Sequence, residues 1–178
     1  YNLLTMICCA SLLPMAISRA EQPLTPAATR LRPSIAWARS PLATAGVIVA
    51  ALSAASFRMV GPIYGQEVGL TADQIGIFLA SFVAGGAIAQ YPIGWLADKF
   101  DRRWVLIWLS VAAVSACALT VLIAGNGTTA ILTSAAIFGF TTFPIYSVSA
   151  AHAHDFATDE ERVELSAALM FFYAVGAI

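Results

Sequence analysis

The sequence has 178 residues, of which 60% are hydrophobic and 11% charged, with a net charge of −1 and a mean hydropathy of +0.81. Soluble domains carry about 25% charged residues, because a surface in water needs them, so this composition excludes an ordinary soluble protein and predicts one surrounded by lipid. The near-neutral charge gives no reason to expect nucleic acid as a partner.

Six apolar runs follow one another along the chain. Residues 1–18 form the first run, and a last run begins near residue 165; both are short for a membrane span. Since a crossing helix needs about 20 mostly apolar residues and backbone in lipid must bond within its own segment, we expect an all-α polytopic bundle. The short terminal runs lead us to expect a piece of a longer protein. The four full spans are predicted at about residues 41–63, 75–97, 104–124 and 128–151, followed by a truncated one at 165–178.

The predicted helix boundaries carry capping signals. Ser40 precedes a proline that suits the first turn of a helix. Thr71 and Gln74 have the spacing of a capping box, in which each side chain bonds the other residue's backbone N–H. Residues 158–161 repeat this pattern, so we predict a second box before the last helix.

Basic residues alternate between the connections. From the first connection to the fifth, the numbers of arginine and lysine residues are 4, 0, 3, 0 and 1. Basic residues concentrate in cytoplasmic loops of membrane proteins, so we predict that the first, third and fifth connections face the cytoplasm, with the protein in the bacterial inner membrane.

The first connection is much longer than the others. Residues 19–40 contain three prolines and four arginines, a composition typical of a linker between two bundles. We therefore divide the chain into the end of a preceding helix (1–18), a cytoplasmic inter-bundle linker (19–40) and a C-terminal transmembrane bundle (41–178).

A motif occupies the third connection. Gly94 is followed after three residues by Asp98 and Lys99, and after two more by Arg102 and Arg103. This pattern resembles the loop signature of the major facilitator superfamily, which that family carries between its second and third helices and again between its eighth and ninth. With residues 19–40 as the family's central loop, the resemblance implies that the chain runs from the end of helix six to the start of helix eleven.

The sequence departs from the common form of the motif at Asp101, where glycine is usual; aspartate suits either a left-handed cap or the start of the next helix. The resemblance implies a secondary transporter that moves a small solute by alternating access, with a missing N-terminal half as partner, the bilayer as surroundings and no cofactor. Asp98 would sit at a helix C-terminus, where its charge needs a compensating partner, and we hypothesise that it latches the outward-open state. Gly94 would let helices pack closely at that point.

Arg58 is the one charged residue inside a full span. A charge at bilayer depth is costly and is a functional candidate by default, yet Arg58 lies about 25 Å along its helix, within reach of the outer interface. Two interpretations stay open: a cavity residue favouring an anionic substrate, or a snorkelling or ion-paired structural arginine. Phe57, Tyr64, Gln90 and Tyr146 are candidates to line the same cavity, although such side chains also pack between helices routinely.

The remaining polar groups favour simpler interpretations. His152, His154 and Asp155 suggest a metal site, but residues two apart on a helix do not share a face, so we predict no metal. The three cysteines lie in apolar runs and read as small hydrophobes. Two alternatives to a transporter remain: a membrane scaffold or receptor that does not transport, and a membrane-embedded enzyme centred on the histidines. No carboxylate falls within the predicted spans, so proton coupling would depend on residues outside them.

Overall fold

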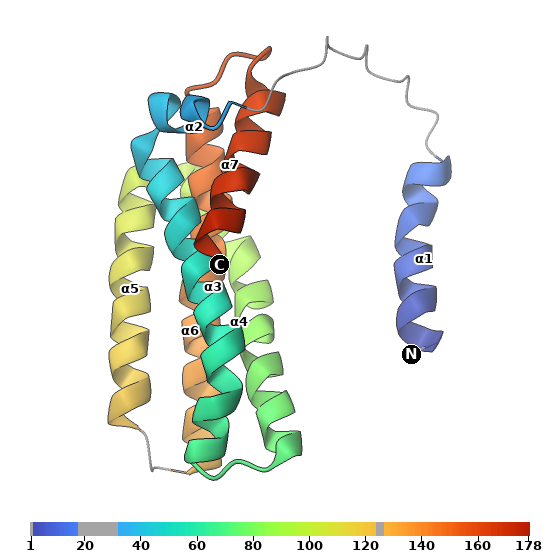
Figure 1. The fold of residues 1–178 in the computed structure, drawn as a ribbon, viewed down its shortest axis with the longest axis vertical. Coiled ribbons are helices and arrows are strands. Elements are labelled where there is room, and N and C mark those ends of the chain that lie inside the picture. Colours follow the sequence, from blue (N-terminus) through green and yellow to red (C-terminus); the bar gives the residue numbers. More distant parts are fainter. Residues whose placement is uncertain (1, 18–31, 124–126) are drawn as a thin grey trace.

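The computed structural model describes residues 2–17, 32–123 and 127–178 and so leaves most of the predicted linker undescribed. The described ranges contain helices and no strands, so the predicted all-α fold is confirmed. Figure 1 shows a bundle formed by all the helices except α1, which lies apart from it. The helices are α1 (Asn2–Ile17), α2 (Ser34–Arg39), α3 (Pro41–Glu67), α4 (Ala72–Lys99), α5 (Arg102–Leu122), α6 (Thr128–His154) and α7 (Arg162–Gly176).

Four of the described helices, α3 to α6, are long and apolar enough to cross a membrane. Large apolar side chains stay exposed along them, including Ile88 at 68%, Trp108 at 68% and Val114 at 71%. Soluble proteins rarely leave such extended apolar surfaces in water, so the bundle is that of a multi-pass membrane protein.

α3 is longer than predicted. It continues to Glu67 and ends where Gly69 takes a positive φ of 80°. The N–H of Gly69 donates to the carbonyl of Gln66 at 3.0 Å, and the N–H of Leu70 donates to the carbonyl of Gly65 at 2.9 Å. These two bonds form a Schellman motif. The predicted end at residue 63 was wrong because the apolar run stops one turn before this glycine terminates the helix.

The predicted caps of α3 and α4 are confirmed. The Ser40 hydroxyl accepts from the N–H of Ala43 at 3.2 Å. At α4, the N–H of Thr71 donates to the side chain of Gln74 at 2.9 Å, while the Thr71 hydroxyl accepts from the N–H of Gln74 at 3.4 Å. Since the box starts the helix at Ala72, α4 begins three residues before the predicted run.

The second predicted capping box is only half formed. The N–H of Thr158 donates to the Glu161 side chain at 3.3 Å, but α7 begins at Arg162 with no side-chain cap bond at its N-cap, Glu161. The Glu161 carboxylate also pairs with Arg39 at 2.6 Å. The prediction of a complete box was wrong because the N–H of Glu161 donates to the backbone carbonyl of Thr158 at 3.0 Å and not to the Thr158 hydroxyl.

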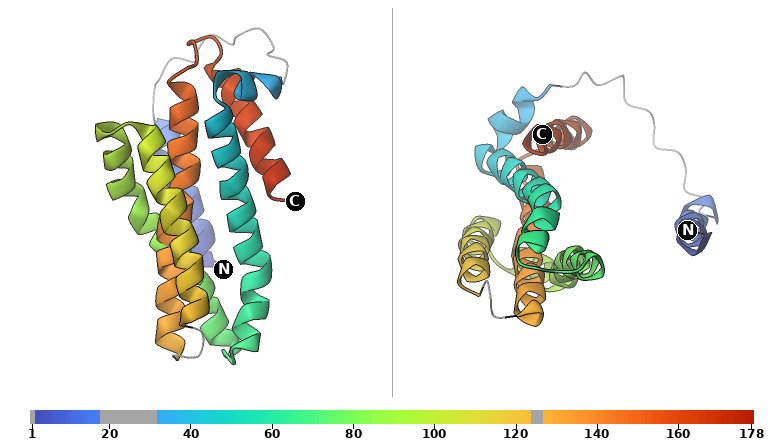
Figure 2. Two further views of the ribbon diagram at one scale, coloured as in Figure 1. Left: turned by 90° about the vertical axis from the view of Figure 1, so that its left-hand side faces the viewer. Right: turned by 60° about the horizontal axis from the view of Figure 1, so that its bottom comes forward.

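α6 is the central helix of the bundle. Half of its most apolar window is buried, against 22–28% for the other three long helices, and it packs on α3, α4, α5 and α7. α4 crosses α6 obliquely (Figure 2). Gly85 and Gly139 allow this approach, since a Cβ on Gly85 would overlap the Ala136 carbonyl and one on Gly139 would overlap the Phe82 carbonyl.

α2 lies within the predicted linker, where no helix was expected. Ala36 is fully buried against α3 and α7, and the ring of Trp37 lies 6.4 Å from that of Phe172. A six-residue helix is unstable alone, so this one depends on tertiary contacts that the local sequence does not reveal. It covers one end of α7 (Figure 1).

Candidate functional site

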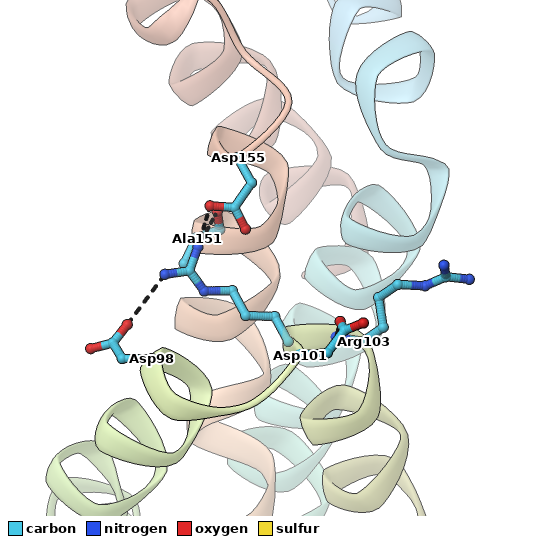
Figure 3. Close-up of polar contacts among 6 residues, drawn as sticks. Asp98, Asp101, Arg103, Ala151 and Asp155 are labelled. Atoms are coloured by element: carbon cyan, nitrogen blue, oxygen red, sulfur yellow. Dashed lines mark hydrogen bonds and ion pairs between the residues drawn. The ribbon is translucent and has the colours of Figure 1, made fainter.

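A charge cluster joins the ends of three helices (Figure 3). The Arg102 guanidinium lies 3.2 Å from an oxygen of Asp98 and 2.5 Å from an oxygen of Asp155, and it also donates to the carbonyl of Ala151 at 3.2 Å. The Arg102 side chain is 24% exposed, against 75% for Asp98 and 48% for Asp155. One arginine thus connects α4, α5 and α6.

The helix ends explain why the cluster needs an arginine. Asp98 lies in the last turn of α4, and Asp155 is the C-cap of α6. Both carboxylates therefore sit at the negative pole of a helix, where their charge is unfavourable. Arg102, the first residue of α5, supplies the compensating positive charge, and its planar fork can serve two acceptors at once.

Asp101 sets the position of that arginine. Its side chain accepts from the N–H of Arg103 at 2.9 Å and caps the start of α5. Of the two conformations expected for this residue, the structure has the helix start. Asp98 and Arg102 are four residues apart in the sequence but lie on different helices, because α4 ends at Lys99 and α5 begins at Arg102.

The other motif residues lie outside the cluster. The Lys99 ammonium sits 4.8 Å from the ring centroid of Trp95, a cation–π contact. Arg103 extends away from the cluster (Figure 3). A Cβ added at Gly94 would meet nothing within 4 Å, so the prediction that Gly94 allows close helix packing was wrong for the described chain; the close approaches occur deeper, along the α4–α6 crossing.

A cavity of about 710 Å³ lies between α3, α4, α6 and α7. Met170 and Val83 on its wall remain 61% and 54% exposed, so the cavity is open on one side. α5 contributes no residue to the wall. The lining residues are Ala50, Ala54, Phe57, Arg58, Leu79, Phe82, Val83, Gln90, Thr142, Phe143, Tyr146, Met170 and Tyr173.

Four of the five predicted cavity residues line this space: Phe57, Arg58, Gln90 and Tyr146. Tyr64 does not. Its ring lies 6.2 Å from that of Phe78, and its buried hydroxyl has no hydrogen-bond partner among the described residues. Tyr64 lies seven residues, about two turns, beyond Phe57 on α3, and its side chain packs on the apolar cluster that contains Leu70 and Phe78.

Sequence reasoning missed several wall residues. Phe82, Phe143 and Tyr173 each lie in an apolar run where core-facing and lipid-facing positions look alike. It also gave Asp155 only a metal-binding role, whereas its carboxylate pairs with Arg102. The spacing of Asp98 and Arg102 by four residues was the only local signal for the cluster.

A largely buried carboxylate was also missed. The Glu164 side chain is 13% exposed and lies in α7, which begins three residues before the predicted span. One oxygen of Glu164 is 3.4 Å from Arg32, although it has no hydrogen-bond partner. Glu164 precedes residue 165, where the predicted span begins, so the prediction that no carboxylate falls within the spans did not include it.

The two histidines and Asp155 turn to different partners. The buried His152 ring packs edge-on against Phe156 at 5.1 Å, and His154 lies 3.2 Å from the hydroxyl of Ser166. Within the described ranges, no three metal-ligating side chains come together.

Comparison with known proteins identifies similar sequences. The model of the family described as the Major Facilitator Superfamily matches residues 43–178. The chain is 26% identical to the uncharacterised MFS-type transporter YcaD of Escherichia fergusonii over 177 residues, which cover 98% of this chain and 45% of that protein. A YcaD protein of Salmonella arizonae is 28% identical over 177 residues, covering 95% of this chain and 44% of the relative.

A further relative is an uncharacterised MFS-type transporter of Enterobacter sp. (strain 638). It is 27% identical over 151 residues, covering 85% of this chain and 38% of that protein. The chain therefore spans less than half the length of these curated relatives. No solved structure matches it.

Proposed function

Because the chain belongs to the major facilitator superfamily, we propose that it supplies the C-terminal half of a secondary transporter that moves a small solute by alternating access. In such proteins two bundles rock about a central binding site. The observation that carries the proposal is the cavity of about 710 Å³ between α3, α4, α6 and α7, which is open on one side. A second bundle would close it.

The relatives support this assignment. They are enterobacterial proteins described as transporters and are more than twice as long as the matched segment. We infer a location in the bacterial inner membrane, with the end that carries α2 and the charge cluster on the cytoplasmic side, as the distribution of basic residues favours. Solute flux requires no chemical conversion, so no catalytic residue is assigned.

A flux assay tests the proposal. The complete protein, reconstituted in liposomes, should take up or release at least one solute from a labelled panel faster than protein-free liposomes do. Protein that is folded by size-exclusion chromatography yet passes no solute, and whose cavity reacts with a thiol reagent from one face only, would instead support a scaffold or receptor.

The charge cluster is the proposed switch. Asp98 shares Arg102 with Asp155 and stays 75% exposed, so a part of the opposite half can approach it at the cytoplasmic rim. We propose that this contact stabilises the outward-open state, in which the cytoplasmic rims are closed. Losing the Asp98 charge should then shift the population towards the inward-open state.

Thiol labelling tests the switch. In a cysteine-free background, the variant Met170→Cys places a reporter on the cavity wall. Adding Asp98→Asn should increase its reaction with an impermeant maleimide in inverted vesicles and decrease it in right-side-out vesicles. Asp159→Asn is the matched control, because Asp159 is 93% exposed and, among the described residues, pairs with Arg162 alone. Equal labelling with and without Asp98→Asn rejects the latch.

A further inference from the structure

The wall of the cavity divides into an apolar part and one cation. Phe57 stacks on Phe82 with ring centroids 4.0 Å apart and planes 17° apart, and Phe82 lies 5.1 Å from Phe143. Leu79 and Val83 extend this surface along α4. Such a surface suits an apolar or aromatic body, and the cavity volume falls within the roughly 300–1,000 Å³ of small-molecule sites.

Among the described residues that line this wall, Arg58 alone is charged. On α3 it follows Ala50, Ala54 and Phe57 at positions that share one helix face. Its Nε donates to the carbonyl of Ala54 at 3.3 Å. No acidic side chain in the described chain pairs with Arg58, which leaves the two terminal nitrogens of its guanidinium without an acceptor.

Arg58 lies well inside α3 and not at its end. Nine residues, about 13 Å of helix, follow it before α3 ends at Glu67. The predicted end at residue 63 left only five. A cation at this depth is costly unless a counter-charge meets it, and the fork geometry of arginine matches a carboxylate in a bidentate manner.

Hydrogen-bonding groups line the other end of the cavity. The Ser147 hydroxyl donates to Gln90 Oε1 at 3.3 Å, and the Tyr146 hydroxyl donates to the Met170 sulfur at 3.5 Å. The Tyr173 ring meets that of Tyr146 edge-on at 5.1 Å. Since Ala50 and Arg58 are eight residues apart, the cavity extends about 12 Å along α3, long enough to separate a charged end from a hydrogen-bonding end.

We propose that the cavity is selective for organic anions, with the carboxylate of the solute bound by Arg58 and its apolar or aromatic body against Phe57, Phe82 and Phe143. This inference rests on the proposed transport function, because the bound anion would be the transported solute. Equilibrium binding tests the anion selectivity and solute flux tests transport, so that either proposal can fail without the other.

Equilibrium binding to the complete protein tests the selectivity. The probes are 1-naphthoate and its neutral isostere 1-naphthamide. Naphthoate should bind at least tenfold more tightly than the amide, and Arg58→Gln should abolish that preference while leaving amide binding unchanged. Arg58→Lys should retain part of it, because lysine keeps the charge but loses the bidentate geometry. Arg162→Gln removes a surface arginine paired with Asp159 and should change neither affinity.

Each result decides one proposal. Equal affinity of the wild-type protein for naphthoate and naphthamide, including no binding of either, overturns the anion selectivity, as does an unchanged preference in folded Arg58→Gln. Charge-selective binding without solute flux leaves the anion site in place and rejects transport. Flux of neutral or cationic solutes without anion preference supports transport and rejects the anion selectivity.

Discussion

The α4–α6 crossing should be the part of the bundle most sensitive to a single added methyl group. In Gly139→Ala, the new Cβ would overlap the carbonyl oxygen of Phe82, a backbone atom that cannot rotate away. The helices must then separate by on the order of 1 Å, and a gap of that size already forfeits roughly a quarter to a half of each dispersion contact across it.

The net cost follows from two opposing effects. Overpacking of a tight interior costs about 1–3 kcal/mol, while replacing glycine with alanine within a helix returns up to about 1 kcal/mol. Because the clash here is with backbone, we take the upper end of the cost and expect a net loss of about 2 kcal/mol. The shift is roughly 2–4 °C per kcal/mol for 150–250 residues and about half that for a complete protein more than twice as long as this chain, so the apparent Tm should fall by about 2–4 °C.

The assay is thermal unfolding of the purified complete protein in detergent, followed by intrinsic fluorescence at one fixed scan rate, since membrane proteins often unfold irreversibly. Gly76→Ala is the matched control on α4, because a Cβ there meets nothing within 4 Å; its Tm should stay level or rise. If Gly139→Ala unfolds within a degree of Gly76→Ala, the close approach of α4 and α6 is not as described.

Two further predictions concern the charged rim. Arg102→Gln leaves the carboxylates of Asp98 and Asp155 at two helix C-termini without their shared cation. The free energy of unfolding should therefore fall by about 1–2 kcal/mol at low salt and by less at high salt, because salt screens these charges. Thermal unfolding at two ionic strengths measures this difference. Glu161→Gln removes the ion pair that joins Arg39 of α2 to the start of α7. Hydrogen exchange of residues 34–39 should therefore speed up.

The second prediction has a pH signature. The hydrogen bond from Arg39 lowers the pKa of Glu161 below its ordinary value. A depressed carboxyl pKa contributes stability that is present above the unfolded pKa and lost as pH falls through the folded one. Protection of α2 in the wild-type protein should thus hold at neutral pH and decline only below about pH 4.5, and Glu161→Gln should remove this dependence. Glu160→Gln, at the exposed neighbouring position, should leave it intact; a decline near neutral pH would point to another group.

Much of the fold could be predicted from local chemistry. The long apolar runs, the Ser40 and Thr71 caps and the alternation of basic residues each depend on residues within a few positions of one another. The errors also have local causes: α3 outlasts its apolar run because Gly69 provides the terminating geometry, and the box before α7 is incomplete because the N–H of Glu161 donates to the Thr158 carbonyl.

The candidate site was only partly predictable. The motif predicted that Asp98 needs a compensating partner, but it did not predict that Arg102 is that partner or that Asp155 joins the pair from 53 residues beyond Arg102. Phe57 and Arg58 were identified as cavity candidates by their type, and Tyr64 was identified on the same grounds although its side chain packs elsewhere.

The sequence by itself determined that this protein is a membrane bundle, where most of its helices begin, and which connections share one side. Only the tertiary structure decided which side chains face the cavity, which face lipid, and that α2 packs on α7. The physical reason is that lipid and a helix interface are almost equally apolar. Hydropathy therefore identifies a membrane-spanning helix but not which of its faces packs against the other helices. α6 illustrates this, since its apolar run resembles the others, yet half of its most apolar window is buried and α3, α4, α5 and α7 all pack on it.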